Sequence, residues 1–211
     1  MDRLHQRGYI TDPHGRAKSV AFTEEGLERA MRSGDDLALD LSRCARGTVL
    51  VCREGTEREA GLALLAEARK DVERNRFSYA MLGFLDNLEA TAKAAEGDLD
   101  AAVELSRRAA DQQFPTGESI WPLATATLVE SLVRRGGRGD NDAAQAALDR
   151  AEAAMPADDV VGFDLHYMRA RAWIARGRRD QNRYRELADR YLATATSLGF
   201  HGHIAAAKAL T

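Results

Sequence analysis

The sequence predicts an all-α protein built as a tetratricopeptide-like array of antiparallel helical hairpins, and two observations support this class. Four glycines, Gly55, Gly97, Gly139 and Gly177, each precede a polar turn and an amphipathic stretch rich in alanine and leucine, at intervals of 42, 42 and 38 residues. The chain is 45% hydrophobic with only four prolines, which suits closely packed helices. A repeat of this length is typical of arrays in which stacked neighbours complete one continuous core.

The first 32 residues differ from the rest of the chain. They read as a helix end, a short strand, a turn containing Pro13 and Gly15, and a second strand in which Val20 and Phe22 alternate with smaller residues. Thr23 is expected to cap a helix that begins at the next residue. We therefore expect residues 1–32 to form a partial winged-helix-like fragment with a short β-hairpin, and residues 33–211 to form the helical repeat domain.

The hairpins follow from helical spacing of apolar residues and from short turns. The pattern predicts one helix over about 33–54 and another over 57–74. It then predicts three pairs of helices: 78–96 with the helix after Gly97, 118–136 with the helix after Gly139, and 160–176 with 181–198. A short last helix is predicted near 201–209. Short Gly/Asp turns force consecutive helices to lie antiparallel. Leu105 is expected to be buried between hairpins.

Composition and motifs exclude several classes of function. A formal net charge of −3 gives no global basic field for nucleic acid or anionic lipid, and no apolar run approaches a membrane span or a secretory signal. Cys44 and Cys52 share a helix face too far apart to bridge, so we expect buried, reduced thiols and a cytoplasmic protein.

Catalytic and metal sites are not expected. There is no phosphate-binding loop, no strand-borne pair of metal-binding aspartates and no nucleophile elbow, so we predict no enzyme activity and no cofactor. His201 and His203 lie two residues apart with no third ligand nearby, and a packing and capping role is favoured over a metal site.

Two resemblances add to this interpretation. The block formed by Asp2–His5, Gly8–Ile10, Asp12 and the residues up to Ala30 resembles the end of a small uncharacterised bacterial family and, less closely, the wing of MarR-type regulators. We expect this fragment to lack the recognition helix of a winged helix, and Arg7, Arg16 and Lys18 alone would give weak, sequence-blind phosphate contacts. A structural remnant is favoured, with a DNA-binding wing as the alternative.

The second resemblance covers about 33–211. The passages 33–51, 61–69, 97–110, 128–136 and above all 184–210 are similar to the C-terminal helical region of actinobacterial class III adenylate/guanylate cyclase–ATPase-type regulators, and 97–109 matches the second helix of a tetratricopeptide repeat. The resemblance implies a regulatory module without its catalytic neighbours.

One candidate binding site is predicted. Arg134, Arg135 and Arg138 end one first helix, and Arg176, Arg178 and Arg179 end the next, where cations complement the negative helix terminus. If successive hairpins align, these arginines gather on one edge and receive an acidic partner segment or a phosphate-bearing ligand. Solvated helix-end charges are the alternative.

Two functional hypotheses result. The first is an interaction scaffold that binds a protein or peptide, such as a cyclase/ATPase or a transcriptional regulator, with no nucleic-acid or membrane partner. The second is a transcription-associated protein whose N-terminal wing contacts DNA. The sequence leaves the identity of the partner and the oligomeric state open.

Overall fold

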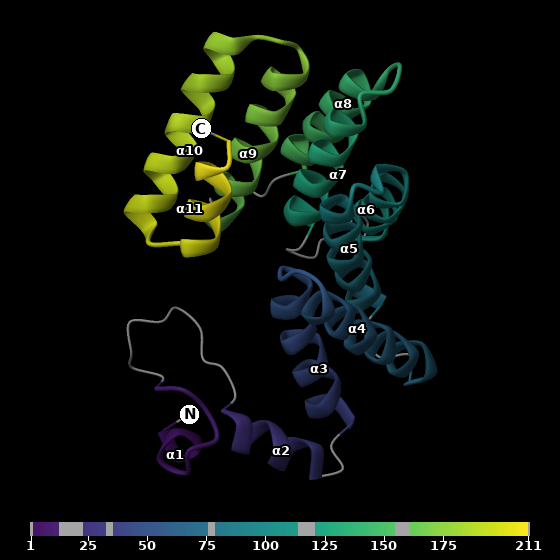
Figure 1. The fold of residues 1–211 in the computed structure, drawn as a ribbon, viewed down its shortest axis with the longest axis vertical. Coiled ribbons are helices and arrows are strands. Elements are labelled where there is room, and N and C mark those ends of the chain that lie inside the picture. The colour runs from purple at the N-terminus through teal and green to yellow at the C-terminus, as the bar shows by residue number, and fades with distance from the viewer. Residues whose placement is uncertain are drawn as a thin grey trace. The chain divides into compact units, whose positions relative to one another are not determined.

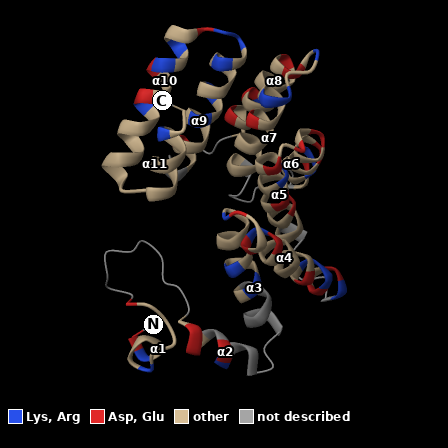
Figure 2. Cartoon of the chain, viewed as in Figure 1, with Lys and Arg blue, Asp and Glu red and all other residues tan. Residues whose placement is uncertain are grey.

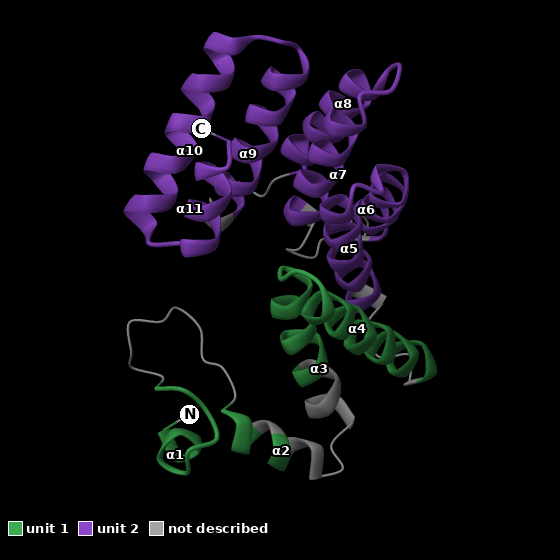
Figure 3. Cartoon of the chain, in the orientation of Figure 1, with its two compact units in different colours: residues 1–77 green, residues 78–211 purple. Residues whose placement is uncertain are grey.

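The computed structural model describes residues 2–12, 23–32, 36–75, 79–113, 121–154 and 161–210. Every regular element within these ranges is an α-helix, which confirms the all-α class. The predicted β-hairpin falls mainly on residues 13–22, outside the described residues. The chain divides into two compact units, Met1–Phe77 and Ser78–Thr211 (Figure 3). The first two helices of the predicted repeat domain therefore belong to the same unit as the N-terminal segment. The domain boundary expected near residue 33 stays a prediction.

The helices follow the predicted order closely (Figure 1). The first unit contains α1 (Asp2–Gln6), α2 (Glu24–Arg32), α3 (Asp36–Val51) and α4 (Thr56–Asn75). The second contains α5 (Tyr79–Glu96), α6 (Leu99–Gln113), α7 (Trp121–Arg135), α8 (Asp140–Ala153), α9 (Val161–Gly177), α10 (Gln181–Leu198) and α11 (His201–Lys208).

The N-terminal segment is held together by Thr23. Its hydroxyl donates to the Gly8 carbonyl, its backbone N–H donates to the Tyr9 carbonyl at 3.0 Å, and the Gly26 N–H donates to its hydroxyl at 3.1 Å. The last of these bonds confirms the predicted N-cap of α2. A Cβ at Gly26 would lie 1.9 Å from the Tyr9 carbonyl oxygen, so only glycine permits α2 to approach this backbone so closely.

Helices α3 and α4 form the hairpin of the first unit. The two helices cross closely at Gly61 of α4. A Cβ at this position would lie only 2.8 Å from both Leu50 Cβ and the backbone nitrogen of Val51 on α3. Cys44 is buried in this crossing, but Cys52 is exposed, which corrects the expectation that both thiols are buried. The reason is that α3 ends at Val51, so Cys52 lies in the turn instead of on the buried helix face.

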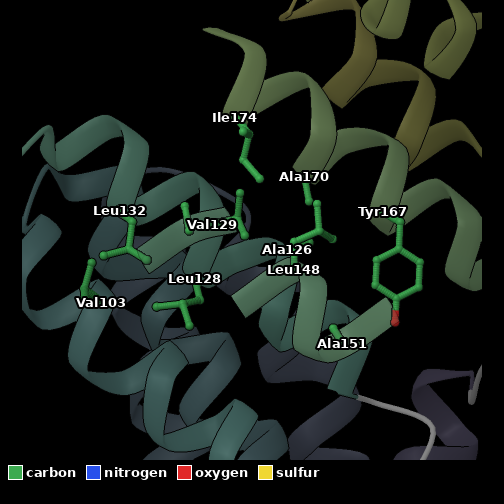
Figure 4. Packing of buried hydrophobic residues seen from close by; sticks show 11 residues of the cluster. Val103, Ala126, Leu128, Val129, Leu132, Leu148, Ala151, Tyr167, Ala170 and Ile174 are labelled. Carbon is green, nitrogen blue, oxygen red and sulfur yellow. The ribbon is translucent and has the colours of Figure 1, made fainter. Parts of the chain in front are cut away.

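The second unit contains three hairpins, α5–α6, α7–α8 and α9–α10, followed by α11, which packs on α10. The α7 helix packs on α6, and α9 packs on α7. Figure 4 shows part of the resulting core, in which buried apolar side chains of α6, α7, α8 and α9 meet: Val103, Ala126, Leu128, Val129, Leu132, Leu148, Ala151, Tyr167, Ala170 and Ile174. A second cluster joins α9, α10 and α11 through Leu165, Met168, Leu187, Tyr191 and Ala207.

Leu105 is only partly buried, which corrects the expectation that it lies between hairpins. The buried face of α6 is instead formed by Ala102, Val103, Ser106 and Ala109. Ser106 tolerates complete burial because its hydroxyl donates to the Ala102 carbonyl at 2.6 Å. The buried face of α6 therefore includes Ser106 and not Leu105, although hydrophobic periodicity alone favours the leucine.

The turn between α9 and α10 has a residue other than glycine in the left-handed conformation. Gly177 is the last residue of α9, and Arg179 adopts the left-handed conformation, with φ 60°. Its N–H donates to the Arg176 carbonyl and the N–H of Asp180 to the Ala175 carbonyl, each at 3.0 Å. The same two bonds form at Gly97 and Asp98, after α5. Arg179 therefore occupies the place that glycine holds in the earlier turn.

Candidate partner-binding site

The six arginines predicted to share one edge separate into three groups. Arg135 is structural: it donates to both carboxylate oxygens of Asp140, at 2.9 and 2.8 Å, and to Asp100 at 3.0 Å. The hydrogen bonds to Asp140 raise the pKa of Arg135, and those from Arg135 lower the pKa of Asp140. This bidentate pair joins the end of α7 to the start of α8 and leaves few donors for a partner.

Arg134 and Arg176 lie together. They line a cleft of about 410 Å³ whose other walls are Leu99, Val133, Trp173 and Gly177, and which we name the tryptophan cleft. The first helices of two successive hairpins, α7 and α9, contribute their C-terminal turns, and α6 contributes its first residue. This is the part of the predicted arrangement in which neighbouring hairpins bring their terminal arginines to one place.

Each arginine of the tryptophan cleft is held by its surroundings. Arg134 donates to the Ala94 carbonyl at 2.7 Å and lies 3.5 Å from a Glu130 carboxylate oxygen. The Arg176 guanidinium lies over the Trp173 ring, 4.9 Å from its centroid, and 5.9 Å from the centroid of Tyr184. Stacking fixes the plane of this guanidinium while none of its N–H groups bonds to another described residue. Arg176 is thus oriented with its donors available.

The tryptophan cleft has an unbalanced charge. Two of its six lining residues are cationic and none is acidic. The nearby Glu130 carboxylate is already bound by Arg169 of α9. The indole N–H of Trp173 is buried without an acceptor within the described part of the chain, so it adds an unsatisfied donor. Because the indole nitrogen is buried, an anionic group with acceptor oxygens would bind the guanidinium donors of Arg176 instead, and Leu99 and Val133 offer apolar contact beside it.

The other three arginines lie elsewhere. Arg178 lines a different cleft, between α8, α9 and α10. Arg138 and Arg179 are exposed in the turns that follow α7 and α9, and neither side chain bonds to a described residue. Figure 2 shows the basic residues gathered at the turn from α9 to α10. Sequence reasoning therefore identified the arginine-rich region, but not its division between two clefts.

A cluster of histidine and tyrosine joins α9, α10 and α11. The rings of His166 and His203 meet edge to face at 4.8 Å, and the Tyr191 hydroxyl is hydrogen-bonded to His203 Nδ1 at 2.7 Å. Burial lowers the pKa of His166 to about 3 and also lowers that of His203. His201 is exposed. Among the residues that the structure describes, no three metal-ligating side chains converge on one point.

The family comparison matches the N-terminal part of the chain. Residues 1–39 match the model of a domain of unknown function, DUF6429. A stretch of 29 residues is 55% identical to the uncharacterized protein y4hR of Sinorhizobium fredii (strain NBRC 101917 / NGR234), covering 14% of this chain and 39% of that protein. The chain thus spans about two-fifths of the length of this relative. No solved structure matches the chain.

None of the described helices combines the length and the apolar character that a segment crossing a bilayer needs.

Proposed function

We propose that this chain is a non-catalytic interaction module whose tetratricopeptide-like hairpins bind an acidic segment of a protein partner in the tryptophan cleft. The observation that carries the proposal is the pairing of Arg134 and Arg176 beside Trp173, with no acidic side chain in the lining. A carboxylate that approaches Arg176 meets a guanidinium whose plane is already fixed, so little side-chain entropy is lost on binding.

The hairpin packing supports the repeat interpretation. Within the second unit, α7 packs on α6 and α9 packs on α7, and the tryptophan cleft lies where the first helices α7 and α9 end. A cleft of about 410 Å³ accepts one or two side chains, so we propose a short linear segment with an apolar residue beside a glutamate or aspartate. The similarity of residues 33–211 to cyclase–ATPase-type regulators makes such a signalling protein the first partner to test.

The test uses a fluorescein-labelled peptide of alternating leucine and glutamate, and a second peptide with glutamine in place of glutamate. Fluorescence anisotropy should detect the acidic peptide but not its neutral counterpart, and Arg176→Glu should weaken binding by about tenfold or more. Arg138→Glu is the matched control, because it makes the same charge change in an exposed turn. Equal losses in both variants would mean that net charge alone attracts the peptide.

A second candidate function is DNA binding through the N-terminal segment. The observation that favours it is the backbone hydrogen bond from the Thr23 N–H to the Tyr9 carbonyl, which brings the start of α2 next to the residues that follow α1, as the base of a wing requires. Retardation of duplex DNA at about 150 mM salt, weakened by Lys18→Ala, would support this function. No retardation under these conditions favours the interaction module.

A further inference from the structure

A second cleft lies on the other side of α9 and has a different construction. The α9 helix packs extensively on α7 but only lightly on α8, and α8 makes little contact with α10. The space between α8, α9 and α10 therefore stays open as a cleft of about 260 Å³, which we name the α8–α10 cleft. It belongs to the second unit alone.

The floor of the α8–α10 cleft is apolar. Leu148 of α8, Ile174 and Ala175 of α9, and Leu187 of α10 line it, and each of these residues is at most 6% exposed. These side chains belong to the cores that hold the hairpins together, so the floor is rigid and already formed. An apolar group that enters the cleft gains contact with all four without any rearrangement.

The rim of the cleft is cationic on one side. Arg171, Arg178 and Arg183 line it, but Arg171 is paired with Glu152 and Arg183 with Glu186. The guanidinium of Arg178 has no hydrogen bond or ion pair to any other residue that the structure describes. Of the two acidic residues of the lining, Glu152 is paired with Arg171, whereas Asp180 keeps its negative charge, because its hydrogen bond at 3.0 Å is to the backbone N–H of Arg183. Arg178 is the one arginine of the lining that has no paired carboxylate among the described residues.

The beginning of α10 lies at the same side of the cleft. Asp180 is the N-cap of this 18-residue helix, and its carboxylate already accepts the Arg183 N–H and offsets the positive end of the helix dipole, so the donors available to an anion are those of Arg178. An apolar floor next to one unpaired guanidinium matches a molecule with an apolar body and a single negative head. The volume of the cleft corresponds to about ten non-hydrogen atoms.

We propose that the α8–α10 cleft binds a small carboxylic acid, with its apolar body on Leu148, Ile174 and Leu187 and its carboxylate on Arg178. This site is separate from the tryptophan cleft, and the proposal does not depend on the binding of a protein partner there. It makes the last hairpin a sensor of an amphipathic metabolite. A single Arg–carboxylate contact and a small apolar surface give a dissociation constant on the order of 1 mM or below.

The experiment uses octanoate as the probe and the full chain as the receptor, with binding followed by saturation-transfer NMR and isothermal titration calorimetry. We expect octanoate to bind and 1-octanol to bind at least about tenfold more weakly, because the alcohol lacks the charge that Arg178 recognises. Arg178→Gln should weaken octanoate binding by a similar factor. Arg138→Gln, the same change in an exposed turn, should leave it unchanged.

Two further measurements test whether octanoate binds in the α8–α10 cleft. Ala175→Leu places extra atoms in the floor and should reduce octanoate binding, while the Arg178 variant remains decisive if this core variant does not fold. Octanoate should not displace the labelled acidic peptide from the tryptophan cleft. The proposal is overturned by absent octanoate binding, by equal binding of octanol, by insensitivity to Arg178→Gln, or by competition with the peptide.

Discussion

The buried histidine of α9 makes the stability of the last hairpin dependent on pH. Burial lowers the pKa of His166 from 6.5 to about 3, and the imidazole Nδ1 has no hydrogen-bond partner among the described residues. His203 and Arg169 also disfavour its protonation. Near pH 5 the folded state therefore keeps His166 neutral, whereas the unfolded chain protonates it. Because the unfolded state binds more protons, stability must fall as the pH falls below about 6.5.

The size of this effect follows from the two pKa values. Between pH 7 and pH 5 a group with an unfolded pKa of 6.5 and a folded pKa of about 3 lowers the free energy of unfolding by about 2 kcal/mol. The loss continues toward pH 3 and stops there, since both states are protonated below it. His203, whose pKa is also lowered by burial, acts in the same direction. The other groups around the cluster are Tyr191, Glu130 and Arg169.

Urea unfolding of the wild type and of His166→Phe at pH 7 and pH 5 measures this contribution. The wild type should lose about 2 kcal/mol more than the variant between the two pH values, because phenylalanine cannot be protonated. His201→Phe is the matched control, since His201 is exposed and should leave the pH dependence unchanged. An equal loss in the wild type and in His166→Phe would refute the assignment of the pH dependence to this histidine.

Four further outcomes are expected. Arg108→Ala should cost about 2 kcal/mol or more in urea unfolding, because Arg108 holds the buried Asp86 carboxylate at 2.6 and 2.8 Å, whereas Arg150→Ala, at an exposed pair with Asp111, should cost less than about 1 kcal/mol. Gly61→Ala should cost about 1–3 kcal/mol by forcing α3 and α4 apart, and Gly202→Ala, with open space around it, should not destabilise. Arg179→Gly should raise the free energy of unfolding by about 0.5–1 kcal/mol by relieving the left-handed backbone; a loss would mean that the arginine side chain is needed there. Purified protein should neither cyclise nor hydrolyse ATP or GTP with Mg²⁺ or Mn²⁺, and turnover that follows the protein through successive columns would contradict this.

Local sequence patterns predicted the positions of the helices in the chain better than they predicted which helix residues are buried. Helical spacing and Gly/Asp turns located the three hairpins of the second unit, because those signals lie within a few residues of each other. Leu105 and Ser106 show the limit: both fit an amphipathic helix, and only packing against neighbouring helices decides which of them is buried. Arg179 shows a related limit, since nothing in the local pattern indicates that a residue other than glycine adopts the left-handed conformation after α9.

The candidate site shows the same limit. The basic run at the end of α9 was predicted to form one edge with the run at the end of α7, and Arg134 and Arg176 do meet. Arg135, however, is paired with the carboxylate of Asp140, five residues further along the chain. This pairing depends on the path of the turn between α7 and α8. The α8–α10 cleft left no signal in the sequence, because it arises from how lightly α9 packs on α8.

The geometry of α9 explains why one basic run serves two clefts. Arg178 directly follows the last residue of α9, and its N–H still donates to the Ile174 carbonyl at 3.0 Å, so the helical advance of about 100° per residue places it on a different side of the helix axis from Arg176. Arg176 therefore lies beside Trp173 in one cleft, and Arg178 lies beside Ile174 in the other. The helix backbone separates the two guanidinium groups, so the two proposed ligands should bind independently. Arg176→Glu should weaken peptide binding by about tenfold or more and spare octanoate, and Arg178→Gln should weaken octanoate binding by about tenfold and spare the peptide; a variant that weakens both would show that the clefts are coupled through α9.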